Sequence, residues 1–171
     1  MKCANLCYNK HERLIGGNPM NNEDVKLLKA LLHGTDNLVS RLSNASAFIN
    51  EALPDVCWVG FYLVNENGDL YLGPFQGKPA CINIKKGHGV CGSAAMNDET
   101  LVVPDVHQFP GYISCDAAAM SEVVIPIHDD EGKVTAVLDI DSATLGRFSD
   151  EDSEEITALK NITEYILTDK A

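Results

Sequence analysis

The sequence predicts an α+β domain in which helices at both ends flank a mainly antiparallel sheet of about six strands. Helical spacing of apolar residues occurs near both ends, short strand-type segments fill the middle, and hairpin turn signals join several of them. The chain has 171 residues, of which 45% are hydrophobic. That length suits one domain with its own core. We therefore expect a single domain over residues 1–171, with an irregular segment over 1–20.

Two helices are expected in the first third of the chain. The first begins at Asn22, which can cap it, and places Glu23 and Asp24 in its electropositive first turn. Gly34 interrupts the pattern, and the second helix ends near Pro54. The apolar faces consist of Val25, Leu28 and Leu32 in the first helix and Leu38, Leu42, Ala45 and Ile49 in the second.

The middle of the chain changes to strand-type patterns. Asn67-Gly68 is a hairpin turn signal, and an acidic turn around Gly132 joins another pair of strands. A short helix of small residues follows Gly87, and a long irregular loop covers 106–120. A last helix is expected from about Ser149, which can cap it. The expected strands are 56–64, 69–72, 80–84, 101–103, 122–127 and 134–141.

Composition excludes several classes of partner. The chain carries 25 Asp and Glu against 13 Lys and Arg, a net charge of -12. Affinity for a phosphate backbone comes from basic side chains, so nucleic acid is not an expected partner. No apolar run has the length of a membrane helix or a signal peptide, and we expect a cytoplasmic protein that does not bind membranes. The cysteine and histidine spacings match no zinc site, and no metal or other cofactor is expected.

Three of the six cysteines are candidates for thiol chemistry. Cys91 lies in the first turn of the short helix, where the helix dipole lowers a thiol pKa. Cys115 lies in the long loop, and Cys81 begins a strand directly after Pro79. A nucleophile with one or two resolving thiols fits this set, and which thiol attacks stays open at this point. Cys57 is interpreted as an inert core residue, whereas Cys3 and Cys7 receive no role.

Acidic and aromatic side chains suggest a pocket. Asp139 and Asp141 are two apart on a strand and share a sheet face, and Glu122 opens the neighbouring strand. Buried carboxylates need a partner, so a polar pocket is favoured over a solvated edge strand. Trp58 and Tyr62 share a face of the first strand, where they either pack in the core or form a wall of the pocket. The pocket acids can hold a substrate ammonium or donate a proton.

Six segments of the sequence resemble those of a known protein family. They are W-V-G-F-Y-L (58–63), G-P-F-Q-G-K-P-A-C (73–81), G-V-C-G-S-A-A (89–95), V-P-D-V-H-Q-F-P-G-Y-I-S-C-D (103–116), S-E-V-V-I-P (121–126) and L-D-I-D-S (138–142). Together they resemble the free methionine-(R)-sulfoxide reductases, a family built on a single GAF domain. The resemblance implies a GAF fold, with the terminal helices on one face of the sheet and loops that form a pocket on the other.

The resemblance also implies roles. Cys115 would be the nucleophile that attacks the sulfoxide, Cys81 the main resolving thiol, and Cys91 an alternative or helper. Glu122, Asp139 and Asp141 would bind free methionine (R)-sulfoxide and assist protonation of its oxygen, while Trp58 and Tyr62 would shape the pocket. Thioredoxin would regenerate the thiols. A ligand-binding or redox-sensing GAF module without turnover remains the alternative, and the oligomeric state, a homodimer included, stays open.

Overall fold

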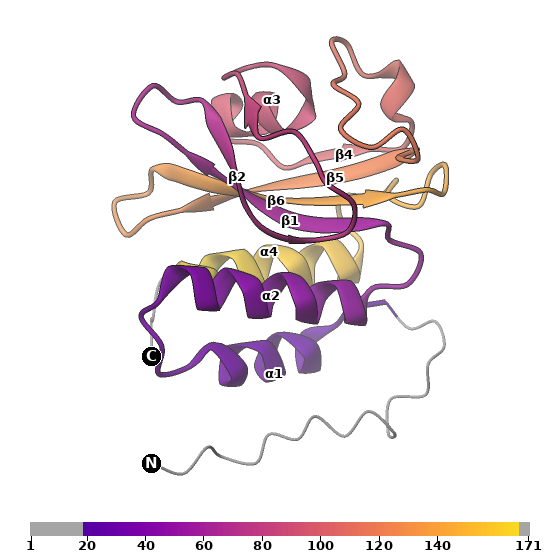
Figure 1. Cartoon of the computed structure of the whole chain (residues 1–171). Coiled ribbons are helices and arrows are strands. Elements are labelled where there is room, and N and C mark those ends of the chain that lie inside the picture. Colours follow the sequence, from indigo (N-terminus) through magenta and orange to yellow (C-terminus); the bar gives the residue numbers. More distant parts are fainter. Residues whose placement is uncertain (1–18, 168–171) are drawn as a thin grey trace.

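The structure is a computed structural model that describes residues 19–167 (Figure 1). Within these residues, four α-helices and six strands confirm the predicted α+β class. The helices are α1 (Asn22–Leu32), α2 (Leu38–Ala52), α3 (Gly89–Asn97) and α4 (Glu154–Ile166). The strands are β1 (Trp58–Val64), β2 (Leu70–Gln76), β3 (Asn83–Ile84), β4 (Leu101–Val103), β5 (Ser121–His128) and β6 (Val134–Ser142). A short 3-10 helix, Val106–Gln108, lies in the long loop.

All six strands form one antiparallel sheet in the order β3-β2-β1-β6-β5-β4. The helices α2 and α4 cover one face, and α3 and the long loop cover the other (Figure 1). Successive strand residues alternate between the faces. In β1, Val59 and Phe61 pack in the cluster under the helices, whereas Trp58 and Tyr62 belong to a second cluster on the α3 side. We call these the helix-side cluster and the site-side cluster.

The terminal helices gather on one side of the sheet, as predicted, in two tiers. Helix α1 packs on α4 and α2 and lies farther from the sheet than they do (Figure 1). Arg41 of α2 connects these tiers, because the residue is only 3% exposed and its guanidinium donates to backbone carbonyls at or just after the C-terminal ends of α1 and α4. These acceptors belong to Leu32, Thr35, Tyr165 and Ile166.

One expected helix cap and one expected helix start are displaced. Helix α1 is capped by Asn21 rather than Asn22, in a capping box that Asp24 completes. Helix α4 begins at Glu154 behind the cap Ser153, so the expected start near Ser149 is wrong. The backbone N–H of Asp152 donates to the Asp150 side chain at 3.0 Å, and this local turn replaces the first helical turn that the acidic run suggested.

None of the helices within residues 19–167 is long and apolar enough to cross a membrane. The expected irregular segment lies almost entirely outside the described residues, as do Cys3 and Cys7.

Candidate active site

Three acidic residues meet on the site side of the sheet because of the strand register. Glu122 of β5 lies directly opposite Asp141 of β6, and Asp139 is two residues from Asp141 on the same face. Their exposed fractions are 5%, 8% and 6%. Since β6 is a central strand between β1 and β5, the alternative of a solvated edge strand is wrong.

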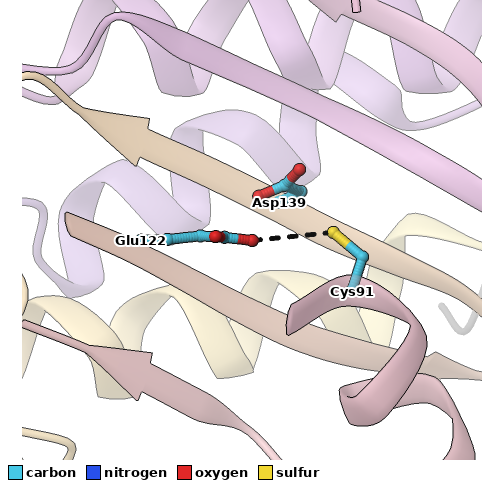
Figure 2. Close-up of side chains that lie close together, drawn as sticks. All are labelled: Cys91, Glu122 and Asp139. Atoms are coloured by element: carbon cyan, nitrogen blue, oxygen red, sulfur yellow. Dashed lines mark hydrogen bonds between the residues drawn. The ribbon is translucent and has the colours of Figure 1, made fainter. Parts of the chain in front are cut away.

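Helix α3 adds a thiol to the acids. Cys91 lies in its first turn, as predicted, and its Sγ donates to Glu122 Oε1 at 3.7 Å (Figure 2). The helix can approach the preceding loop closely because its fourth residue is Gly92, where a Cβ would lie 2.6 Å from the Lys85 carbonyl oxygen. A glycine at this position therefore helps to set the depth of the thiol.

The other two candidate thiols form a disulfide. Cys81 and Cys115 are joined with their Cα atoms 5.4 Å apart, which is the pairing that the resemblance implied. Cys81 precedes the short β3 rather than beginning a strand. The Tyr62 hydroxyl donates to the Cys81 carbonyl at 3.0 Å, and Lys78 lies 3.4 Å from Asp116, next to Cys115. The loop that carries Cys115 is thus tied back to the segment before β3.

A small cavity of about 20 Å³ lies between the disulfide, α3 and the acids. That volume holds roughly one water molecule. The lining residues combine the acids Glu122, Asp139 and Asp141 with Cys91, Cys115, His88, Tyr112, Gly89, Ile84, Val90 and Ile113. His88 and Tyr112 are additions that periodicity in the sequence did not identify, because both lie in loops.

The two aromatic residues of β1 lie behind this cavity and are not among the described residues that line it. Trp58 is 2% exposed, donates from Nε1 to the Lys78 carbonyl at 3.1 Å, and stacks on Phe75. Gly77 leaves room for the indole, because a Cβ there would lie 2.6 Å from the ring. In this disulfide form Trp58 and Tyr62 therefore support the segment that leads to Cys81.

Burial dominates the electrostatics of the site. Desolvation, together with the neighbouring carboxylates, raises the pKa of Glu122 and of Asp141 well above the ordinary range. The pKa of Asp139 rises only to about 6, because burial is opposed by hydrogen bonds from Cys91 and Glu122. Of the three acids, Asp139 is the one whose carboxylate form is favoured by hydrogen bonds that oppose the effect of burial.

The expectation of an acidic Cys91 thiol is wrong. Burial first, and then the charges of Asp139 and Glu122, raise its pKa well above the usual value and outweigh the helix dipole. Cys57 also differs from its prediction, since it precedes β1 and is only half-buried. Its pKa rises to about 11, mainly through desolvation.

This fold and this site define a class of protein. The GAF domain model matches residues 37–165, so the chain belongs to the GAF domain family. Within that family, the free methionine-R-sulfoxide reductase of Escherichia coli is 45% identical over 138 residues, or 81% of this chain and 82% of that protein. The Saccharomyces cerevisiae protein of the same name is 44% identical, with 78% of each chain covered. The chain belongs to the free methionine-R-sulfoxide reductases, a family of enzymes.

Solved structures agree with this assignment. The reduced form of fRMsr from Staphylococcus aureus has a TM-score of 0.81 at 44% identity, covering 89% of this chain and 97% of that one. Free methionine-R-sulfoxide reductase from Neisseria meningitidis, in complex with its substrate, has a TM-score of 0.77 at 37% identity, covering 85% and 86%.

Proposed function

We propose that this protein reduces free methionine-R-sulfoxide to methionine through the thiols of Cys115 and Cys81. The observation that carries the proposal is the Cys81–Cys115 disulfide, which closes a cavity lined by three buried carboxyl groups. Relatives that carry this activity in their names support the choice of substrate. A buried acidic cavity also suits the ammonium of a free amino acid, since a buried cation needs a partner.

The thiol chemistry proceeds in three balanced steps. Cys115 attacks the sulfoxide sulfur, the oxygen passes to Cys115 as a sulfenic acid, and the substrate sulfur leaves as a thioether reduced by two electrons. Cys81 then attacks the Cys115 sulfur, and water departs as the disulfide forms. An external dithiol, for which we propose thioredoxin, reopens the disulfide and becomes oxidised in turn.

The three carboxyl groups have different roles in substrate binding and proton transfer, and the role of each depends on whether it is protonated. Asp139, with its pKa near 6, supplies the carboxylate that pairs with the substrate ammonium. Burial raises the pKa values of Glu122 and Asp141 and so favours their protonated forms. A protonated carboxyl group next to the reacting centre can donate to the sulfoxide oxygen as it leaves sulfur.

Substrate binding follows reduction in this scheme. The cavity of about 20 Å³ in the disulfide form is far too small for an amino acid. Breaking the disulfide releases the loop that carries Cys115 from its covalent link to the segment before β3. The loop can then move, so that the cavity enlarges and the attacking thiol is free.

The test uses the separated epimers of free methionine sulfoxide, with thioredoxin, thioredoxin reductase and NADPH. We expect NADPH oxidation with the R epimer alone, and none with methionine sulfoxide inside a peptide. Single turnovers without thioredoxin separate the thiols. Cys115→Ser should release no methionine, whereas Cys81→Ser should release about one equivalent as the sulfenic acid forms and then stop. A normal burst from Cys115→Ser would contradict the assignment, and Cys57→Ser is the matched control.

A further inference from the structure

Figure 2 shows the carboxyl group of Glu122 pointing toward the Cys91 sulfur, with the carboxyl group of Asp139 close to both, and all three residues line the cavity. One donor atom from each of the three lies within 4.8 Å of the others. The exposed fractions of these residues are 4%, 5% and 6%. The donors come from α3, β5 and β6, so regular secondary structure holds each of them in place.

One oxygen of this cluster has no hydrogen-bond partner within residues 19–167. Asp139 Oδ1 is buried and unpaired, and Asp139 is only 6% exposed. Buried polar atoms are nearly always satisfied, and an unsatisfied carboxylate oxygen is especially costly. This atom therefore indicates a site for a cationic ligand.

The size of the cavity and the chemistry of its donor atoms indicate which kind of cation can bind there. A volume of about 20 Å³ accepts one small ion and excludes an organic cation. A thiolate with two carboxylates suits zinc, which binds sulfur at about 2.3 Å and oxygen at about 2.0 Å in a four-coordinate site. Calcium requires six or more oxygen ligands, and magnesium keeps an octahedral shell.

We propose that Cys91, Glu122 and Asp139 bind a single zinc-type cation, and that this ion competes with the sulfoxide substrate. Asp141 or a water molecule completes the four ligands, since Asp141 lines the same cavity. When zinc binds, the three donor atoms must move about 1 Å closer together than the 4.8 Å within which they now lie. The reason is that the ligand atoms of tetrahedral zinc lie roughly 3.3–3.5 Å apart. The competition rests on the proposed function, whereas the metal site stands independently of it.

The metal site is tested with Co²⁺ alone on the full-length disulfide form, in which Cys81 and Cys115 are unavailable as ligands. The background variant replaces Cys3, Cys7 and Cys57 with serine, which leaves Cys91 as its free thiol. We expect one equivalent of Co²⁺, a sulfur-to-cobalt charge-transfer band, and strong visible bands of four-coordinate cobalt that Zn²⁺ abolishes. Cys91→Ser should remove the charge-transfer band, and Asp139→Asn should weaken binding at least tenfold.

A charge-transfer band that survives Cys91→Ser would overturn the site, as would the weak visible spectrum of octahedral cobalt. Circular dichroism of each variant confirms that it is folded. Competition is measured on the reduced protein, where Zn²⁺ should raise the KM for methionine sulfoxide and leave kcat unchanged. Cobalt binding through Cys91 without a change in KM would refute the competition alone. An absence of reductase activity would refute the proposed function and leave the spectroscopic result valid.

Discussion

The Cys81–Cys115 disulfide should contribute strongly to the stability of the fold, and its effect can be worked from the length of chain that it closes. The two cysteines are 34 residues apart in the sequence. The chain-entropy relation for a loop of that length gives about 4 kcal/mol at 25 °C. In a domain of this size each 1 kcal/mol shifts Tm by about 2–4 °C, so oxidised protein should melt roughly 8–16 °C above reduced protein.

Calorimetry of the oxidised and reduced proteins, both with a metal chelator present, measures this difference. Cys81→Ser and Cys115→Ser should each melt near the reduced wild type in the absence of reductant. Cys57→Ser should retain the full redox-dependent shift, because Cys57 is a free thiol outside the disulfide. A difference in Tm of less than about 2 °C between the oxidised and reduced proteins would refute the prediction. It would mean that the disulfide does not lower the entropy of the unfolded chain by the amount that the chain-entropy relation requires.

Three further changes test other parts of the structure. Asp139→Asn should be more stable than the wild type above about pH 6, and the advantage should vanish near pH 4 in thermal melts with chelator. The reason is that wild-type stability falls as pH rises from the unfolded pKa of about 4 to the folded value of about 6. Arg41→Met should cost about 3–5 kcal/mol in urea unfolding, because it leaves buried carbonyls unpaired. Wild-type stability would contradict this account of the helical tiers. Gly92→Ala should cost about 1–3 kcal/mol by the same measurement, since its Cβ would press on the Lys85 carbonyl. The exposed Asn97→Ala, in the same helix, is the near-neutral control.

Strand periodicity predicted the faces of the sheet well. Asp139 and Asp141 face the site side while Leu138 and Ile140 face the helices, as the two-residue repeat requires. The position of Glu122 beside them followed from hairpin pairing. The partnership of Cys81 with Cys115, in contrast, came only from the family resemblance. Loop paths are not encoded in any local period.

The properties of Cys91 could not be predicted from its neighbours in the sequence. Its place at a helix start indicated a lowered pKa, yet the residues that control its pKa lie on strands 31 or more positions farther along the chain. Desolvation likewise depends on how deeply α3 packs. The start of α4 was misplaced for a local reason, because a turn at Asp150 and Asp152 replaces the helical turn that was expected after Ser149.

The division of the apolar residues into two clusters has a consequence for motion. The helix-side cluster contains the packing of α1, α2 and α4, whereas the site-side cluster contains α3 and contacts of the cysteine-bearing segments. Local opening is governed by the contacts of the segment that opens. Reduction of the disulfide can therefore raise hydrogen exchange in α3 and residues 104–120 while amides of α2 and β6 stay protected. Each round of oxidation and reduction would then tighten and loosen one side of the sheet, while the other side keeps the chain folded.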